Sequence, residues 1–351
     1  MKRIGLMWIC LLALSSLLVG CGQSAQGKAP EITNNPSKQT AFLMGTIVTV
    51  KVYDEGKEAV LEPVFERIES LANDITQEDE AGSEIVNVNR NAGINPVKVS
   101  EDIYKLIDAG KNHSKQAEGS FDISVGPLTS LWHIGFPDAR VPEQSELDEV
   151  LPLIDYEKIE LNQEEQTVFL TEKGMKLDLG AIAKGYITDE VKEVLEEHQV
   201  QSAIIDLGGN IYVLGKNAAG KAWTVGIQDP FSARGETVGK IPESNKSIVT
   251  SGVYERYLEA EGTKYHHLLN PKDGYPFTND IAGVSIISDK SIDGDALSTA
   301  VFSKGIREGR RFIEDIEGAE AIFVSHDKKV YTTSGLKKEF VLTNDEFEME
   351  Q

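Results

Sequence analysis

The sequence predicts an α+β fold with mixed sheets and flanking helices, built as one large domain. Segments with the β-branched and aromatic composition of strands are interspersed with segments whose apolar residues recur at helical spacing. These segments do not alternate strictly, as they would in a purely parallel α/β sheet, so mixed sheets are expected. A chain of 351 residues, 40% of them hydrophobic, can build a large core in one domain or in two smaller ones.

The first residues have the pattern of a secretion signal. Lys2 and Arg3 precede an uncharged apolar run, residues 4–20, which is short for a membrane-spanning helix. The run ends in LVGC, where Cys21 resembles the lipid-carrying cysteine of bacterial lipoproteins. We therefore expect residues 1–20 to be a lipoprotein signal peptide and the protein to be lipid-anchored at Cys21, on the extracytoplasmic face of a bacterial cell membrane. An uncleaved anchor, or a plain signal with an incidental cysteine, is an open alternative.

A flexible tether is expected at residues 21–40, before a folded domain at 41–345. The tether lacks hydrophobic periodicity and is rich in Gly, Ser, Gln, Asn and Pro, a composition typical of linkers. A β-branched strand interrupted by Gly45 is expected at 42–53, and Ser100 is expected to cap a helix. Further strands are expected at 175–179, 202–207, 223–228, 247–250, 254–259, 283–287 and 321–324. Further helices, identified by apolar spacing, are expected at 57–76, 181–197, 294–302 and 305–316.

Charge and cysteine content exclude some classes of function. The 35 basic and 57 acidic side chains give a net charge of −22, so no basic excess exists for binding a nucleic-acid backbone. A small anionic ligand needs only local positive charge and stays possible. The two cysteines, Cys10 and Cys21, are too few for a disulfide framework or a cysteine-based zinc site.

The segment LDLGAIAKGY, residues 177–186, runs from a strand through a glycine turn into a helix. The start of a helix favours an anion, and Lys184 could add charge for a phosphate. Ala181 leaves its carbonyl uncrowded, so that oxygen can face a hard cation. The open alternative is an ordinary strand–turn–helix, with Asp178 as a turn residue and Lys184 in solvent.

A second segment, DGDALSTA at residues 293–300, places Asp295 and Thr299 four positions apart, on the same face of a helix. Carboxylate and hydroxyl oxygens suit a hard cation such as Mg²⁺, with Asp293 as a possible outer partner. The open alternative is that Asp295 only caps the helix.

Two further segments carry a histidine pair and aromatic residues. Residues 266–277 contain adjacent histidines at 266–267, of which one could act as a general base or bind a phosphate. Residues 119–132 are glycine-punctuated and apolar, and Phe121 and Trp132 could flank a flat ring. For both segments a purely structural role is the open alternative.

Seven short sequence motifs, in their order along the chain, together resemble those of the ApbE family, the FAD:protein FMN transferases. The resemblance spans roughly residues 42–325. The motifs are Met44-Gly45-Thr46, Gly119-Ser120-Phe121-Asp122 with Val125-Gly126-Pro127-Leu128, Leu177 to Tyr186, Asp206 to Asn210, Ser251-Gly252 with Tyr254-Glu255-Arg256, His267 to Pro271 with Gly274, and Asp295 to Ala300.

The resemblance implies a reaction and a set of roles. The family cleaves the pyrophosphate of FAD with Mg²⁺, joins the FMN half to a threonine or serine hydroxyl of an acceptor protein as a phosphoester, and releases AMP. By resemblance, Asp295, Thr299 and the carbonyl of Ala181 bind the metal, and His267 lies near the scissile phosphates. The positions that match FAD contacts are Met44, Ser120, Phe121, Asp122, Asp178, Lys184 and Leu269. The expected acceptor is a membrane-associated redox subunit with a Ser/Thr-Gly-Ala-Ser/Thr motif.

Several alternatives stay open from the sequence alone. His267 is the expected general base, although Asp293 or Asp295 could serve instead. The same metal site could support hydrolysis of FAD to FMN and AMP, and a non-catalytic lipoprotein that binds and delivers flavin is a further possibility. Asn270 stands where the family usually has Asp before proline, and it serves equally well if only the turn matters.

Overall fold

The computed structural model describes residues 31–77 and 82–350, and its folded unit begins at Ile32. The predicted signal peptide and Cys21 therefore lie outside the described residues. In the part of the chain that the structure describes, no helix combines the length and hydropathy needed to cross a bilayer.

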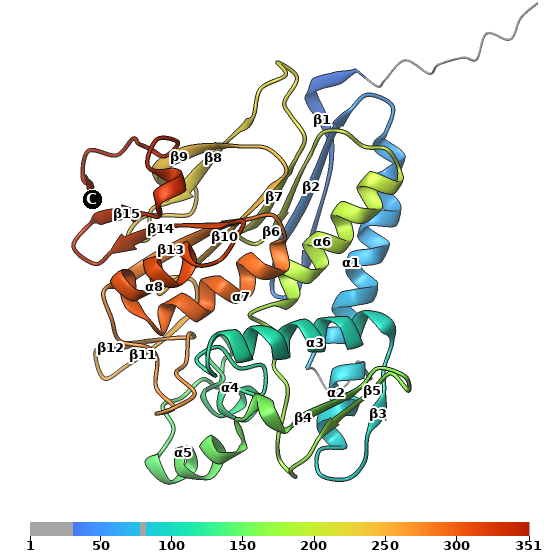
Figure 1. The fold of residues 1–351 in the computed structure, drawn as a ribbon, viewed down its shortest axis with the longest axis vertical. Helices are drawn as coiled ribbons and strands as arrows, with labels where there is room; N and C mark the ends of the chain where they lie inside the picture. Colours follow the sequence, from blue (N-terminus) through green and yellow to red (C-terminus); the bar gives the residue numbers. More distant parts are fainter. Residues whose placement is uncertain (1–30, 78–81, 351) are drawn as a thin grey trace, which may run out of the picture. The chain divides into compact units, whose positions relative to one another are not determined.

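A nine-stranded sheet forms the centre of the folded unit (Figure 1). Neighbouring strands are antiparallel except for one parallel pair at the edge, which joins β15 to β17. The predicted mixed sheet is therefore confirmed. In sheet order the strands are β1 (Ile32–Leu43), β2 (Thr46–Asp54), β6 (Ala203–Leu207), β7 (Asn210–Leu214), β10 (Lys246–Gly252), β13 (Ile281–Ser288), β14 (Ala319–Ser325), β15 (Lys329–Thr332) and β17 (Glu348–Met349).

Three small sheets accompany the large one. The first contains β16 (Val341–Leu342), β9 (Thr237–Glu243) and β8 (Trp223–Gln228). The second contains β3 (Val97–Lys98), β5 (Thr167–Leu170) and β4 (Ile159–Asn162). The third is the hairpin of β11 (Tyr257–Ala260) and β12 (Thr263–His266).

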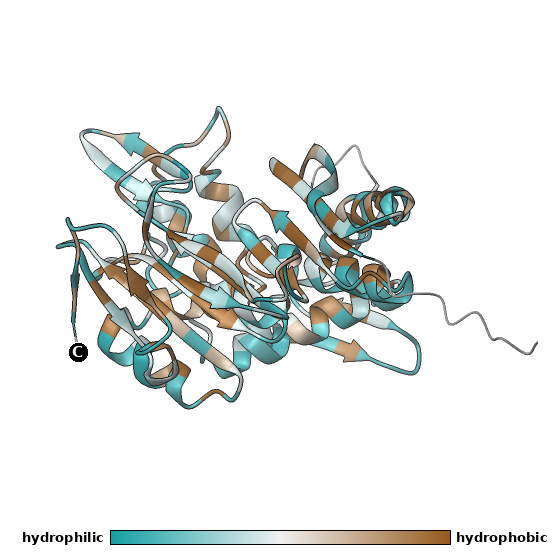
Figure 2. Ribbon diagram, turned by 90° about the horizontal axis from the view of Figure 1, so that it is seen from above, coloured by the Kyte–Doolittle hydropathy of each residue, from teal (hydrophilic) through white to brown (hydrophobic). Residues whose placement is uncertain are grey.

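Several of the helices pack against one face of the large sheet. In chain order the helices are α1 (Leu61–Ile75), α2 (Glu84–Arg90), α3 (Glu101–Gln116), α4 (Gly126–Trp132), α5 (Gln144–Val150), α6 (Ala183–Glu197), α7 (Ser291–Phe302) and α8 (Gly305–Glu314). Apolar side chains of α1, α3 and α6 share one core cluster with β2 and β6, and those of α7 and α8 share another with β13 and β14. The opposite face packs on β8 and β9. Figure 2 shows the apolar residues concentrated along the central strands, and all eight residues of β13 are buried.

Three local predictions need correction. The strand expected at 42–53 is a hairpin, because Met44 and Gly45 both adopt positive φ values, 53° and 69°, and turn the chain between β1 and β2. Residues 32–40 of the predicted tether belong to β1, whose backbone pairs with β2 although its side chains lack periodicity. Residues 175–179 form no strand: they make one bridge, from Lys176 to Val125, and Leu177 is held by the amide side chain of Asn89.

Other elements are confirmed with shifted ends. Ser100 caps α3 through its side chain, which accepts from the N–H of Ile103 at 3.3 Å. The helix expected at 294–302 begins earlier, at Ser291, for a reason given below.

Candidate active site

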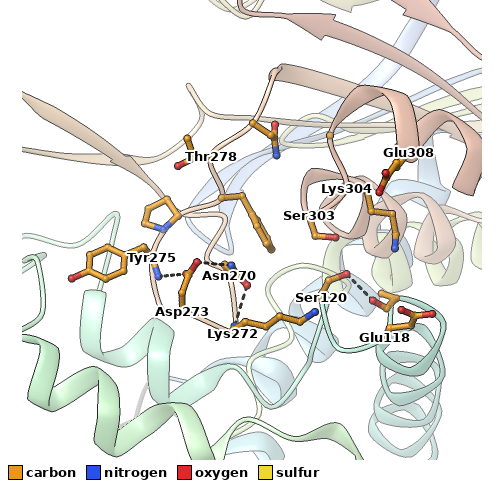
Figure 3. A pocket seen from close by; sticks show the side chains of 15 residues that line it. Glu118, Ser120, Asn270, Lys272, Asp273, Tyr275, Thr278, Ser303, Lys304 and Glu308 are labelled. Carbon is orange, nitrogen blue, oxygen red and sulfur yellow. Dashed lines mark hydrogen bonds between the residues drawn. The ribbon is translucent and has the colours of Figure 1, made fainter.

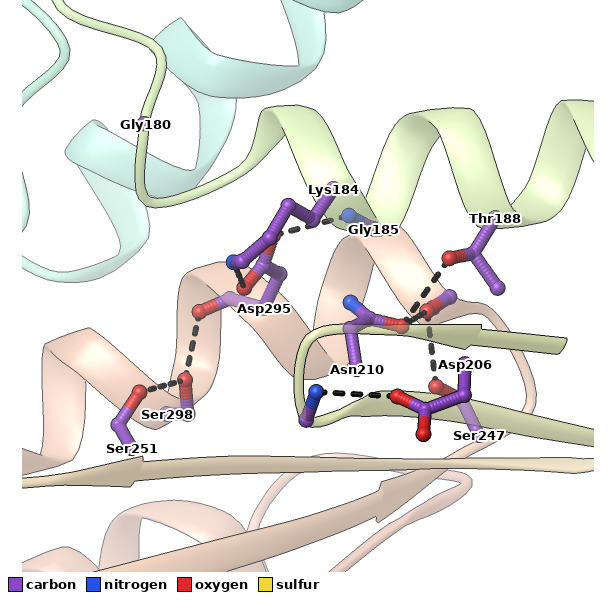
Figure 4. Close-up of polar contacts among 12 residues, drawn as sticks. Gly180, Lys184, Gly185, Thr188, Asp206, Asn210, Ser247, Ser251, Asp295 and Ser298 are labelled. Atoms are coloured by element: carbon purple, nitrogen blue, oxygen red, sulfur yellow. Dashed lines mark hydrogen bonds and ion pairs between the residues drawn. The ribbon is translucent and has the colours of Figure 1, made fainter. Parts of the chain in front are cut away.

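Asp295 is the buried centre of a polar cluster between α6 and α7 (Figure 4). Its side chain is 4% exposed, and Lys184 of α6 donates to its two carboxylate oxygens at 3.0 and 3.3 Å. The backbone N–H of Gly185 donates to the same carboxylate at 2.9 Å. Asp295 therefore lies inside α7 and does not cap it, which rules out the alternative interpretation of this residue.

Gly185 allows the two helices to approach closely. A Cβ at this position would lie 2.4 Å from the backbone oxygen of Ser291 and 2.6 Å from Cα of Ile292. Any side chain would therefore separate α6 from α7 and move Lys184 and the Gly185 N–H away from Asp295. Gly185 was not predicted as a functional residue, because the sequence shows it only as a small residue inside a helix.

Two oxygen atoms that were predicted to bind a metal together with Asp295, the Ala181 carbonyl and the Thr299 hydroxyl, have no hydrogen-bond donor among the described residues. The carbonyl of Ala181 lies in the turn before α6, and the first-turn N–H of Gly185 donates to Asp295. No hydrogen bond within the described residues reaches that carbonyl. Thr299, one turn after Asp295 on α7, is half-buried, and its hydroxyl also has no hydrogen-bond partner in the described chain. One carboxylate, one hydroxyl and one carbonyl oxygen are the donor set that a hard cation takes, so these residues fit Mg²⁺.

Buried polar contacts fix the position of α7. Asp189 of α6 accepts from the N–H groups of Ser291 and Ile292 at 2.8 and 2.9 Å, and so caps α7 from a neighbouring helix. This tertiary cap starts the helix three residues before its predicted beginning. Burial raises the pKa of Asp189 to about 6. Deeper in the helix, Ser298 donates to the carbonyl of Asp295 at 2.8 Å and lies 2.8 Å from the hydroxyl of Ser251 on β10.

His267 lies just after β12 and is half-buried. Its Nδ1 lies 3.2 Å from the carbonyl oxygen of Arg256, and because that oxygen can only accept, Nδ1 carries the proton. In the neutral ring, Nε2 is then the acceptor. Burial, assisted by the positive charges of Arg256 and Lys184, lowers the pKa of His267 to about 4. A histidine in this state can accept a proton at neutral pH.

The two aspartates suggested as alternative bases both have partners. Asp293 lies 3.0 Å from Nε2 of His113 on α3, and Asp295 is bound by Lys184. Nε2 of His267, by contrast, has no hydrogen-bond partner among the described residues, and its role as the base stays a prediction.

The segment before α4 is held rigidly. Asp122 is buried and accepts from the N–H and hydroxyl of Ser124 and from the N–H of Tyr156, at 2.7–3.0 Å. Burial raises its pKa. Phe121 is also buried and meets His113 edge-on. Trp132 is fully buried, and its Nε1 donates to the carbonyl of Gly274 at 2.7 Å, so the core-packing alternative holds for this residue.

Asp178 shapes the turn before α6. Its carboxylate accepts from the N–H of Gly180 at 2.9 Å and from the hydroxyl of Thr129 at 2.6 Å. These contacts match the turn interpretation, and a contact with FAD at this position stays a prediction. Met44 lies in the β1–β2 turn, where it packs against the core, and Leu269 is buried against the cluster around Trp132.

A pocket of about 520 Å³ lies beside the end of α7 (Figure 3). Ser120 lines it, and its hydroxyl donates to the carbonyl of Ala117 at 2.7 Å. Asn270 lines the same pocket and makes the turn expected of it, since its Oδ1 accepts from the N–H of Lys272 at 3.0 Å. The Asn270 substitution therefore preserves the turn.

The ApbE family model matches residues 44–323 of this chain. The chain belongs to the ApbE family. This membership confirms the resemblance found in the sequence, and the match extends from the β1–β2 turn through the Asp295 helix to β14.

Relatives named FAD:protein FMN transferase align with most of this chain. An FAD:protein FMN transferase of Klebsiella pneumoniae is 36% identical over 307 residues, which cover 88% of this chain and 95% of the relative. An FAD:protein FMN transferase of Treponema pallidum is 32% identical over 350 residues, covering 95% of this chain and 94% of the relative.

Solved structures show the same fold. The crystal structure of the ApbE protein of Thermotoga maritima matches with a TM-score of 0.79 and 28% identity, over 86% of this chain and 98% of the other. The flavinyl transferase ApbE of Pseudomonas stutzeri, in its apo form, matches with a TM-score of 0.77 and 25% identity, over 88% and 98% of the two chains.

Proposed function

We propose that this chain is an FAD:protein FMN transferase. It transfers the FMN half of FAD to a threonine or serine hydroxyl of an acceptor protein and releases AMP. The observation that carries the proposal is that Lys184 and the N–H of Gly185 converge on the buried Asp295 between α6 and α7, in a chain that matches named transferases along most of its length.

The cation in this proposal is Mg²⁺, held by Asp295, Thr299 and the carbonyl of Ala181. When bound, it supplies positive charge that offsets the charge developing on the diphosphate. Lys184 adds a second positive charge from α6, and it is placed there by its contact with Asp295. Phosphoryl transfer depends mainly on such charge neutralisation and on alignment, so a site of this composition suits it.

His267 acts as the general base in this proposal. Its Nε2 takes the proton of the acceptor hydroxyl, whose oxygen bonds to the phosphorus of the FMN half. The bond from that phosphorus to the AMP oxygen breaks, and AMP leaves. The lowered pKa keeps His267 neutral at physiological pH, so that Nε2 can accept the proton as the P–O bond forms.

We further propose that the mature protein is lipid-anchored through Cys21 and acts outside the cytoplasm. The sequence LVGC at the end of an uncharged apolar run supports this. An anchor of this kind would place the site near a membrane-associated redox subunit carrying a Ser/Thr-Gly-Ala-Ser/Thr motif.

The test is incubation of the purified protein with FAD and Mg²⁺, with and without an acceptor fragment carrying that motif. Flavin fluorescence that stays on the acceptor in a denaturing gel is the expected result. Release of free FMN without acceptor labelling would show a hydrolase instead. Tight FAD binding with neither product would show a flavin carrier.

A further inference from the structure

Arg256 is held beside His267 by main-chain contacts. It lies in the turn between β10 and β11, and its carbonyl accepts from the N–H of His267 at 3.1 Å. The adjacent residues Tyr257 and His266 are partners in the β11–β12 ladder. The hairpin therefore fixes the spacing of Arg256 and His267, and an arginine side chain starts next to the expected base.

The Arg256 side chain lies against two tight turns. A Cβ placed on Gly45 would be 3.5 Å from Nη2 of Arg256, and one placed on Gly135 would be 3.4 Å from its Cδ. Both glycines have positive φ, 69° and 100°. The guanidinium thus reaches the β1–β2 turn, where Met44 is an expected FAD contact.

No acidic side chain within residues 31–77 and 82–350 lies within ion-pair distance of Arg256. Arg256 is exposed, whereas other arginines of this acidic chain, such as Arg67 and Arg140, pair with carboxylates. Lys184, the other cation that acts on His267, is bound to Asp295. Arg256 therefore brings positive charge to the site without an internal counter-charge.

We propose that Arg256 binds the diphosphate of FAD. This inference rests on the proposed function, since it takes FAD as the substrate. The guanidinium presents paired N–H donors that match two phosphate oxygens, whereas the lysine ammonium is a point charge. Arg256 then selects flavins that carry phosphate and leaves recognition of the ring system to other residues.

The test compares the affinities of FAD and riboflavin, measured by flavin fluorescence with Mg²⁺ present. Arg256→Met is expected to weaken FAD binding about 10- to 100-fold, the range for hydrogen bonds to charged groups, and to change riboflavin binding by less than about twofold. Arg256→Lys should lie between wild type and Arg256→Met for FAD. The matched control is Arg307→Met, whose arginine is 79% exposed on α8 and should leave both affinities unchanged.

Two results would overturn the inference. One is unchanged FAD affinity in Arg256→Met, and the other is an equal loss for FAD and riboflavin, which would indicate a structural role. Circular dichroism melting of each variant separates misfolding from lost contacts. If the proposed function itself were wrong, the result would be different: wild-type protein would bind FAD but would not attach FMN to the acceptor.

Discussion

Lys184 and Asp295 form an ion pair of 3.0 Å between α6 and α7, and the Asp295 side chain is only 4% exposed. The pair joins a residue expected to contact FAD to a residue expected to bind metal. Because Asp295 is buried, its charge has to be satisfied by a neighbouring cation, which is Lys184 in this structure. The local chemistry of the site therefore depends on how α6 and α7 pack together.

Replacing Asp295 by Asn should strongly reduce metal-dependent turnover. Asn keeps the size of the side chain and an oxygen for the Gly185 N–H, but it removes the negative charge that holds a cation. We expect FMN transfer to fall about 100-fold or more, as for other lost electrostatic contacts in active sites. The control is Asp289→Asn, an exposed ion-pair partner of Lys246, which should keep full activity. Full activity in Asp295→Asn would mean that the cation binds elsewhere.

Replacing Gly185 by Ala should destabilise the protein and inactivate it. The new Cβ would lie 2.4 Å from a backbone oxygen of α7, so the helices must separate. Overpacking of this kind costs about 1–3 kcal/mol in the free energy of unfolding, measurable by chemical denaturation. Glu193→Ala, an exposed change on the same helix, should stay within about 0.5 kcal/mol of wild type. Equal stability of the two variants would contradict the close helix contact.

The pH dependence of kcat/KM should reveal the unusual histidine. With a pKa of about 4, His267 stays neutral over the range in which an ordinary histidine becomes protonated. The acidic limb of the profile should therefore fall near pH 4, with activity nearly constant from about pH 5 to 7.5. A limb near pH 6.5 would show that His267 is solvated normally or is not the base.

The same histidine should affect stability in a defined direction. Between about pH 4 and 6.5 the unfolded chain binds the His267 proton and the folded chain does not, so this group makes stability rise with pH. Its stabilising contribution is lost as the pH falls through this window. His267→Gln should lose part of that dependence in denaturation curves measured from pH 4 to 7. An unchanged slope would contradict the assigned pKa.

Replacing Cys21 by Ala should release the protein from membranes. The thiol is the only expected site of lipid attachment, and without it the chain lacks the acyl chains that hold it to the bilayer. Fractionation of expressing cells should move the protein from the membrane to the soluble fraction. Continued membrane retention would overturn the lipoprotein assignment.

Much of the fold was predictable because local patterns agreed with the tertiary structure. The helices α1 and α3 and the strands β6, β8 and β14 lie where composition and periodicity placed them. The errors arise where long-range contacts decide the conformation. Residues 32–40 form a strand because β2 supplies the backbone partners, and residues 175–179 do not, because Asn89 satisfies part of their backbone.

The candidate site was only partly predictable for the same reason. Asp295 and Thr299 were identified by their spacing, and Lys184 by its place in a motif. The contacts that join these residues cross from α6 to α7, so no local pattern in the sequence reveals them. Asp189 and Gly185 were missed because an aspartate and a glycine inside a helix give no signal of a cap or of a helix crossing.

The most direct test of the account is a crystal structure with FAD and Mn²⁺ in place of Mg²⁺, using anomalous scattering to locate the metal. The account predicts a manganese peak between the Asp295 carboxylate, the Thr299 hydroxyl and the Ala181 carbonyl, with the FAD diphosphate next to it. A metal peak away from these three oxygens, or a diphosphate bound remote from α6 and α7, would contradict it.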